Sequence, residues 1–561
     1  MSPAPAPPTG TPAPAPANTS FNDRLVSQTF TVDGAASQAT LDAAGGNVTF
    51  GRSAGTTVSV SYDAARNSYS VSAGGVSQTF GASDIQSTAS NETIYRKIDG
   101  PARDALTLTS AREAGQAAPQ FVRIGQFQRN LTVEGHHEAL FGAFTYGFAT
   151  PAAAVPRTGV VSFDTYTTGT ATTRGFEVAT FEGSGQLDVD LAAGIFYTQM
   201  NTLETGSSPG SGVVGGGIEV IATGRLASGD GSFTGNVIYG GRTSRLAGTL
   251  AGRFYGPTAE ELGASFSATG MGDTTVTGAF IGYRDPTNTR VNLTLINMTR
   301  SQRFFTQGHL LSVADALATG GVNASTRSLD GSLDDQTSGN LSFSPGSSNL
   351  LGGDFTVTAI VPSRDPNFVS YDKTLNGETA ALDLYKRGSD NAQLALTYAS
   401  LVRYRTYTAS TRQNIYLYAT YGLDTPPGLL TARTGTGRYQ GFVYGAAGDR
   451  SATSYNVTGT STYDVDFSAQ SYAGSLDLRG AAMNGAGSLE FGAFSFSGGL
   501  QRNSRDSVTG LQRAGARVGT LTTRFFGPSG EELAGQFTLS LPGIDAGGST
   551  EIVGATVAKR Q

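Results

Sequence analysis

Two adjacent histidines are the side chains in this sequence best suited to bind a metal ion or a haem iron. The stretch VEGHHEAL places His136 and His137 beside Glu134 and Glu138, and the chain has His 3 in all. Imidazole can ligate haem iron, and the carboxylates could act as further ligands or as hydrogen-bond partners of the ligands. Adjacent strand residues point to opposite faces, so both imidazoles could reach one metal only from an irregular loop. The favoured interpretation is a polar turn between two domains, and haem or metal binding is the alternative.

Arginine and tyrosine gather in a second stretch, LVRYRTYTASTRQNIYLYATY at residues 401–421. Both residue types are enriched at protein interfaces, which makes this stretch a candidate binding surface. Tyrosine is equally common in β-strands that pack inside a sheet or barrel. The candidates for an interface are Arg403, Tyr404, Arg405 and Tyr407.

Two pairs of adjacent glutamates, Glu260-Glu261 and Glu531-Glu532, could suggest acid-base catalysis. Neighbouring residues of a helix do not face each other, so neither pair suits that chemistry. A Ser/His/Asp arrangement also lacks supporting sequence context. We therefore predict a protein that is not an enzyme and carries no cofactor, in which these glutamates have structural roles.

The glutamates belong to a motif that occurs twice, as GRFYGPTAEELGASF at residues 252–266 and as TRFFGPSGEELAGQF at residues 523–537. An aromatic pair ends a strand, because the proline that follows cannot donate to a β ladder. A hydroxyl residue three positions before the second glutamate has the spacing of a capping box, and glycine ends the short helix. The residues of the pattern are Gly256, Pro257, Thr258 and Glu261 in the first copy and Gly527, Pro528, Ser529 and Glu532 in the second. The motif thus predicts a strand followed by a one-turn helix.

The composition is typical of a β protein rich in tight turns, with Gly 76, Tyr 22, Phe 30 and only 15% charged residues. The net charge of -6 is spread along the chain without a basic stripe, so we predict that no nucleic acid is bound. Cys 0 excludes disulfides and thiolate metal sites. No apolar run reaches the roughly 18 residues of a transmembrane helix.

Other segments recur at about the same spacing as the motif, roughly 270 residues. FTYGFATP resembles YATYGLDTP, and GQLDVDL matches STYDVDF. In GQLDVDL, Leu187, Val189 and Leu191 point to one face of a strand, and Asp188 and Asp190 point to the other. Such strands, separated by Gly-rich turns, predict an antiparallel barrel in each of two tandem lobes. A transmembrane barrel alternates in the same way, but the duplicated domains and an N-terminal spacer count against it.

The repeat divides the chain into a spacer and two lobes, each with a variable handle sheet and a better preserved barrel. We expect a spacer at 1–20, the N-lobe handle at 21–138, the N-lobe barrel at 139–285, the C-lobe handle at 286–412 and the C-lobe barrel at 413–561. The Pro/Ala-rich spacer is expected to be extended and semi-rigid, as if to hold the folded body away from an anchor. A disordered terminus is the alternative.

The duplicated motif resembles the sequence near the end of the β-barrel domains in the transferrin-binding protein B family. The aromatic pair, the Gly-Pro step, the small polar residue and the Glu-Glu-Leu run match at 252–268 and 523–539. The resemblance implies an all-β fold of two tandem lobes, each with a β-sheet handle followed by an antiparallel eight-stranded barrel. It carries over no ligand-contact residue, because the long binding loops of classical members have no counterpart here.

Members of this family are surface lipoproteins of Gram-negative bacteria that pass a captured iron or haem carrier to a TonB-dependent outer-membrane transporter. The resemblance implies that transporter and an extracellular protein or iron/haem-complex ligand as partners. It also implies a lipid anchor in the outer membrane, with Met1 at or near the place of a lipidated cysteine that this sequence lacks. Direct haem or small-ligand binding through His136 or His137, and a structural or adhesive role without transport, are the alternatives.

Overall fold

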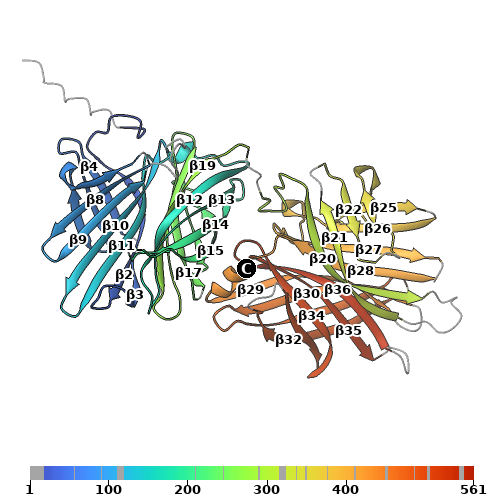
Figure 1. Ribbon diagram of the computed structural model, residues 1–561. Coiled ribbons are helices and arrows are strands. Elements are labelled where there is room, and N and C mark those ends of the chain that lie inside the picture. The colour runs from blue at the N-terminus through green and yellow to red at the C-terminus, as the bar shows by residue number, and fades with distance from the viewer. Residues whose placement is uncertain are drawn as a thin grey trace, which may run out of the picture.

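The computed structural model is built almost wholly from β-strands, which form two lobes side by side (Figure 1). It describes residues 18–561 except 56, 90, 110–118, 209, 244, 288–290, 315–323, 336–337, 348–349, 376, 410–411, 449–452, 486, 502–505 and 543–548. The expected spacer therefore lies outside the described residues, apart from 18–20. Within the described ranges, no helix is both long and apolar enough to cross a membrane.

In the described part of the chain, the N-lobe handle consists of a sheet of order β1-β4-β5-β6 and a larger sheet of order β3-β2-β11-β10-β9-β8-β7. The strands are β1 (Gln28–Thr29), β2 (Thr31–Leu41), β3 (Val48–Gly55), β4 (Val58–Asp63), β5 (Ser68–Ala73), β6 (Val76–Phe80), β7 (Ile85–Thr88), β8 (Glu92–Asp99), β9 (Ala102–Thr109), β10 (Val122–Val133) and β11 (His136–Gly147), with the 3₁₀ helix η1 (Ala82–Asp84). Phe80, Phe127 and Phe144 are buried in the core that contains residues of both sheets. This aromatic packing fixes the small sheet on the large one.

The N-lobe barrel closes with eight strands in sequence order within the described residues. They are β12 (Val160–Thr172), β13 (Ala179–Asp190), β14 (Ile195–Gly206), β15 (Val213–Leu226), β16 (Ser232–Tyr239), β17 (Leu246–Tyr255), β18 (Glu261–Thr269) and β19 (Thr275–Arg284), and η2 (Ala152–Ala154) precedes them. Leu187, Val189 and Leu191 belong to the barrel core, as the alternation on β13 predicts.

The C-lobe handle is a nine-stranded sheet of order β23-β22-β21-β20-β28-β27-β26-β25-β24 within the described residues. Its elements are β20 (Gln302–Ala314), β21 (Ala324–Asp335), β22 (Leu341–Ser344), β23 (Gly353–Phe355), η3 (Val357–Ala359), β24 (Ile360–Val361), β25 (Phe368–Leu375), β26 (Glu378–Tyr385), η4 (Gly388–Asp390), β27 (Ala399–Thr408) and β28 (Gln413–Gly422). A short helix, α1 (Pro427–Ala432), leads into the second barrel.

The described residues of the C-lobe barrel also form eight strands that close in sequence order. They are β29 (Thr436–Gly448), β30 (Ser454–Asp466), β31 (Ser471–Ala482), β32 (Ser488–Gly499), β33 (Asp506–Arg513), β34 (Ala516–Phe526), β35 (Glu532–Pro542) and β36 (Ser549–Arg560). The predicted fold class, two tandem lobes of handle and antiparallel eight-stranded barrel, is confirmed.

The last strand before each barrel belongs to the handle, which corrects the boundaries expected after residues 138 and 412. Strand β11 pairs with β10 and β2 of the N-lobe handle, and β28 pairs with β20 and β27 of the C-lobe handle. The barrels begin at Val160 and Thr436. Sequence similarity between the lobes crosses these boundaries because β11 and β28 pack against their barrels in both lobes.

Candidate functional site

The first copy of the Gly-Pro motif fastens the N-lobe barrel to its handle. The carboxylate of Glu261, at the start of β18, accepts hydrogen bonds from the backbone N–H groups of Gln120 (2.7 Å), Phe121 (2.9 Å) and Val122 (2.9 Å). Those three residues lead into handle strand β10. One buried side chain thus satisfies three backbone donors at the start of a handle strand that lies 139 to 141 residues earlier in the chain.

The second copy repeats this arrangement in the C-lobe. Glu532 accepts the N–H groups of Thr397 (2.7 Å), Tyr398 (2.8 Å) and Ala399 (2.9 Å), at the start of handle strand β27. Burial raises the pKa of the Glu532 carboxyl, whereas the three donors and Lys559 oppose the shift. We call Glu261 and Glu532 the anchor glutamates.

The capping box and the one-turn helix predicted from the motif are wrong. Residues 256–259 form a turn, in which Gly256 has a φ of 86°, and Glu261 already belongs to β18. Thr258 donates hydrogen bonds from its N–H and its hydroxyl to Glu260, the first glutamate of the pair, at 2.8 and 2.7 Å. The second glutamate is therefore free to bind a distant backbone, and Gly527 (φ 87°) marks the same turn in the C-lobe.

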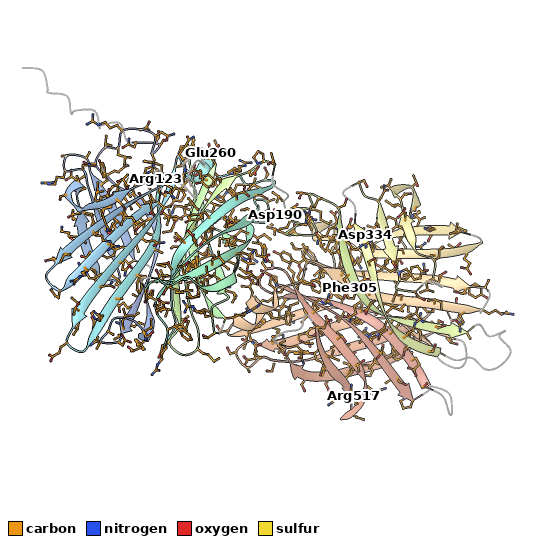
Figure 2. All side chains as sticks on the ribbon, in the orientation of Figure 1. Arg123, Asp190, Glu260, Phe305, Asp334 and Arg517 are labelled. Atoms are coloured by element: carbon orange, nitrogen blue, oxygen red, sulfur yellow. The ribbon has the colours of Figure 1, made fainter. Side chains whose placement is uncertain are left out.

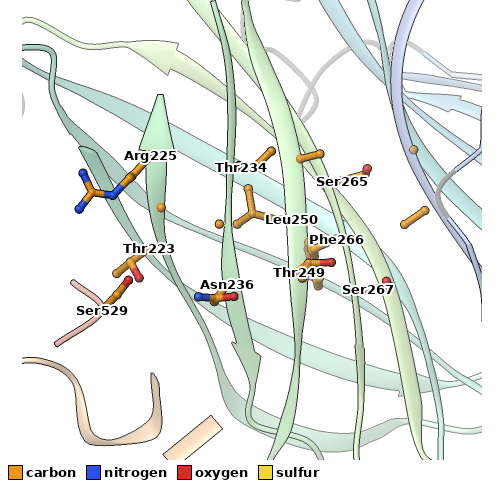
Figure 3. A pocket seen from close by; sticks show the side chains of 15 residues that line it. Thr223, Arg225, Thr234, Asn236, Thr249, Leu250, Ser265, Phe266, Ser267 and Ser529 are labelled. Carbon is orange, nitrogen blue, oxygen red and sulfur yellow. The ribbon is translucent and has the colours of Figure 1, made fainter. Parts of the chain in front are cut away.

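The turn of the second copy also contacts the N-lobe. Thr223 on β15 donates its hydroxyl to the carbonyl oxygen of Pro528 at 3.1 Å, and the Arg225 guanidinium lies 3.2 Å from the carboxylate of Glu531. A groove of about 550 Å³ runs along the outer barrel wall here, between handle strand β2 and Ser529 (Figure 3). The outer barrel wall of this groove carries short polar side chains, among them Thr223, Thr234, Asn236, Thr249, Ser265 and Ser267.

The linker between the lobes is held by a buried carboxylate on β13. Asp190 is fully buried and accepts hydrogen bonds from the Thr294 hydroxyl (3.0 Å) and the Asn297 amide (3.0 and 3.2 Å). It lies on the side of the N-lobe that faces the C-lobe (Figure 2). The alternation on β13 correctly places Asp190 away from the barrel core, but the sequence carries no signal that a linker covers it. We call this contact the linker clamp.

The histidine pair lies in a hairpin within the handle, rather than in a turn between handle and barrel. His136 and His137 begin β11 opposite Val133 and Thr132 of β10. His136 Nε2 lies 3.6 Å from a carboxylate oxygen of Glu138, and adjacent strand residues point to opposite faces. The two imidazoles therefore do not converge. Among the described residues, no group of three or more His, Asp or Glu side chains could hold a metal ion.

The remaining histidine is expected to make the stability of the C-lobe depend on pH. His309 on β20 is buried, and burial lowers its pKa to about 4. The unfolded chain binds a proton near pH 6.5 and the folded chain does not, so stability falls as pH drops from 6.5 towards 4. We expect a loss of about 2 kcal/mol between pH 7 and pH 5. Urea unfolding of the wild type and of His309→Gln at both pH values measures it, and an equal pH slope in the variant would refute it.

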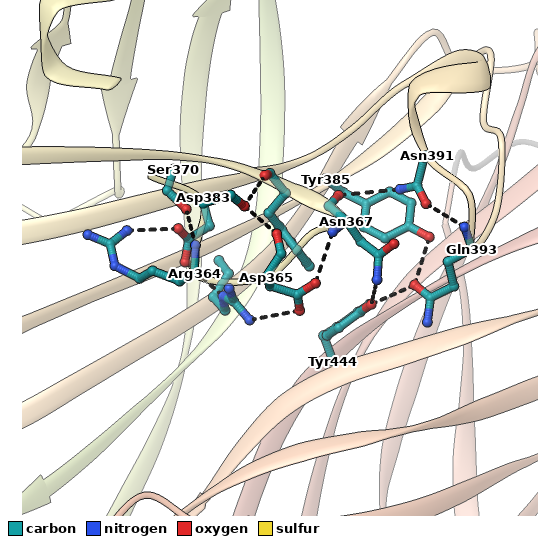
Figure 4. Close-up of polar contacts among 12 residues, drawn as sticks. Arg364, Asp365, Asn367, Ser370, Asp383, Tyr385, Asn391, Gln393 and Tyr444 are labelled. Carbon is teal, nitrogen blue, oxygen red and sulfur yellow. Dashed lines mark hydrogen bonds and ion pairs between the residues drawn. The ribbon is translucent and has the colours of Figure 1, made fainter. Parts of the chain in front are cut away.

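The interface candidates Arg403 and Tyr404 have internal partners in the C-lobe handle. Arg403 pairs with Asp383 at 2.8 Å and with Asp365 at 3.7 Å, in the polar network of Figure 4. Tyr404 is fully buried, and its hydroxyl donates to the carbonyl oxygen of Leu351 at 3.0 Å. The sequence did not single out Asp383, which is fully buried and also pairs with Arg364.

The structure leaves the other two candidates nearer the surface. Arg405 is half-buried, and Tyr407 is 40% exposed near the end of β27. The polar network around Arg403 extends to the C-lobe barrel through Tyr444 on β29. The hydroxyls of Tyr385 and Tyr444 both donate to Gln393, at 3.1 and 2.5 Å (Figure 4). The four residues therefore do not form one exposed patch, and contact of Arg405 and Tyr407 with a partner stays a prediction.

An exposed groove of about 380 Å³ lies in the N-lobe handle, beside the turn between β5 and β6. Phe50 is 44% exposed, and Val76 and Leu131 are half-buried. Charged groups flank them: Arg129 pairs with Asp104 through two 2.6 Å hydrogen bonds, and Glu138 is exposed. We call this site the handle groove; its lining residues are Gln38, Ala39, Thr40, Phe50, Arg52, Val76, Arg129, Leu131, Glu138, Ala139 and Leu140. Sequence alone does not reveal it, because the lining comes from five strands.

This architecture defines a bilobed β protein in which a carboxylate anchors each barrel to its handle. A family model described as the C-lobe and N-lobe beta barrels of Tf-binding protein B matches residues 431–560. A curated relative, Transferrin-binding protein B of Haemophilus influenzae (strain 86-028NP), is 27% identical over 309 residues, which are 52% of this chain and 46% of the relative. The match thus spans about half the length of that relative. These matches confirm the resemblance to the transferrin-binding protein B family.

Solved structures of the same family are also similar to the chain. The intact Ap-TbpB structure with N and C lobes has 13% sequence identity and a TM-score of 0.27, over 94% of this chain and 95% of that chain. Isotype 1 transferrin binding protein B from serogroup B Neisseria meningitidis has 16% identity and a TM-score of 0.25, over 81% of this chain and 87% of that chain.

Proposed function

We propose that this chain is a non-enzymatic surface protein that captures an iron or haem carrier, or another macromolecular ligand, through the handle groove. The observation that carries the proposal is the exposed Phe50, with apolar neighbours and flanking charges, in a groove at the protein surface. Exposed aromatic residues flanked by arginines are typical of protein interfaces. The relatives named as transferrin-binding proteins support a protein carrier as the ligand.

The proposal includes a lipid anchor in the outer membrane of a Gram-negative bacterium and delivery to a TonB-dependent transporter. Tethering would raise the effective concentration of the captured ligand near the transporter. Binding through a broad rigid surface suits this role, because the anchor glutamates fix handle and barrel as one unit in each lobe. Co-purification of the intact lipoprotein with a TonB-dependent transporter tests this part, and its consistent absence favours an adhesive or structural role.

The ligand can be identified by immobilising the protein and exposing it to iron-loaded transferrin, lactoferrin and haem-loaded albumin. Retention of one of these carriers supports the proposal. Binding of none, together with normal growth of a deletion strain on every iron source, would refute it. Titration with free haem tests the alternative, which requires an absorbance band that is lost on replacing His136 or His137.

We expect Phe50→Asp to weaken binding of the retained carrier by about 10- to 100-fold, because a charge replaces the aromatic anchor of the interface. Surface plasmon resonance with the intact protein measures the change. Phe305→Asp is the matched control, since Phe305 is 48% exposed on the C-lobe handle (Figure 2). Equal affinities of the two variants would show that the handle groove is not the contact site.

A further inference from the structure

The two barrels differ at one seam. In the N-lobe, β15 and β16 pair continuously from Val220 opposite Tyr239 to Leu226 opposite Phe233. Their counterparts in the C-lobe, β32 and β33, pair at a single position in the described residues, Ser495 opposite Gln512. Both strands nevertheless pair along most of their length with their other neighbours, β31 and β34. Among the residues that the structure describes, the C-lobe barrel therefore lacks most of the backbone ladder between these two strands.

Side-chain hydroxyls form some of the hydrogen bonds between β32 and β33. Thr509 on β33 donates its hydroxyl to the carbonyl oxygen of Ser497 on β32 at 2.5 Å. The hydroxyl oxygen of Ser507 accepts the N–H of Gln501, which follows β32, at 3.3 Å. Each of these hydroxyl contacts satisfies one backbone N–H or C=O group. A continuous ladder would instead pair the backbone groups of the two strands one after another.

Register shifts in the two neighbouring strand pairs accompany the short ladder. The β31–β32 pairing shifts register between Leu478 and Arg479, and the β33–β34 pairing shifts between Leu511 and Gln512. Such bulges bend and twist the strands that carry them. Strand β32 also ends in Gly498-Gly499, which adds no side chain to hold the seam. The extra residues of these two shifts are Phe491 on β32 and Val518 on β34, so one bulge lies on the seam itself and the other on the strand next to β33.

The barrel core lies directly behind this seam. Phe494, Phe496 and Leu511 come from β32 and β33 and belong to the core cluster of the C-lobe barrel. Val508, on the same strand as Leu511, is 59% exposed. Separation of the two strands would therefore give access from outside to an apolar interior, without breaking a long row of backbone hydrogen bonds.

We propose that the C-lobe barrel opens locally between β32 and β33, while the N-lobe barrel stays closed between β15 and β16. The opening is a lateral entrance to the interior of one barrel only. It follows from the missing backbone ladder and from the bulges that flank it. The seam is then the least stable pair of neighbouring strands in either barrel.

Amide hydrogen exchange of the intact protein tests the proposal. The amides of β33 that face β32 are expected to exchange at least about 10-fold faster than those of β16 that face β15. Strands β15 and β16 of the same molecule are the matched control. Exchange in β33 as slow as in β16 would overturn the proposal.

A reversible lock provides the second measurement. A Cβ atom at position 498 would lie 3.1 Å from the Cβ of Thr509, so Gly498→Cys with Thr509→Cys can form a disulfide after a small shift. The chain has Cys 0, so no other thiol interferes. Exchange in β33 is expected to slow at least about 10-fold in the oxidised form relative to the reduced form of the same variant. Equal exchange in the two forms would contradict local opening at the seam.

Discussion

Replacing Glu532 by alanine is expected to lower the free energy of unfolding of the C-lobe by about 3–6 kcal/mol. The substitution leaves the N–H groups of Thr397, Tyr398 and Ala399 without their acceptor. Each unsatisfied buried donor costs about 1–3 kcal/mol, and the partly buried N–H of Thr397 is expected to lie at the low end of that range. The chain has Trp 0, so urea unfolding followed by far-UV circular dichroism is the suitable measurement. We expect the C-lobe transition to move to lower urea while the N-lobe transition stays in place.

The neighbouring glutamate is the matched control for this experiment. Glu531 accepts the N–H of Ser529 and pairs with Arg225, whose side chain is 63% exposed. Its replacement by alanine should cost only about 1 kcal/mol, because it leaves one partly buried N–H without its acceptor and removes an ion pair whose arginine is largely exposed. Glu261→Ala should reproduce the large effect in the N-lobe. If Glu532→Ala and Glu531→Ala unfold at the same urea concentration, the anchor role is wrong.

The anchor glutamates show which features of the repeated motif can be predicted from the sequence and which cannot. The repeated motif correctly indicates two related lobes, and Gly256 and Gly527 mark the turns that end the strands. The spacing of Thr258 and Glu261 fits a capping box equally well, although Glu261 binds residues 120–122 instead. A local pattern cannot distinguish a near backbone donor from a distant one, because the carboxylate has the same chemistry in both cases.

The interface candidates and the handle groove are harder to predict, because their exposure depends on contacts with residues that are distant in sequence. Alternation along β27 shows that Arg403 and Tyr404 point to opposite faces, but not which face is covered. The structure shows that Tyr404 is buried and that Asp383 pairs with Arg403. The handle groove depends on residues from β2, β3, β6, β10 and β11, and only pairing in three dimensions brings them together. Sequence periodicity gives the face of a strand, whereas exposure depends on what packs against that face.

The linker clamp leads to the second large effect. Asp190→Ala should lower the free energy of unfolding by about 3–5 kcal/mol, because the Thr294 hydroxyl, the Asn297 amide and the N–H of Ala193 all lose a buried acceptor. Loss of the clamp should also widen the range of distances between the lobes, which small-angle X-ray scattering measures.

The C-lobe barrel contains a natural control for the clamp. Asp466 matches Asp190 in the repeat and accepts the N–H of Ala469 at 2.8 Å, the counterpart of the bond from Ala193 to Asp190. It is half-buried rather than fully buried, so Asp466→Ala should cost about 1 kcal/mol. The difference between the two variants isolates the contribution of the linker contacts from that of the shared turn. Equal unfolding midpoints and unchanged scattering would mean that the lobes are held by other contacts, such as those of Arg225 with Glu531.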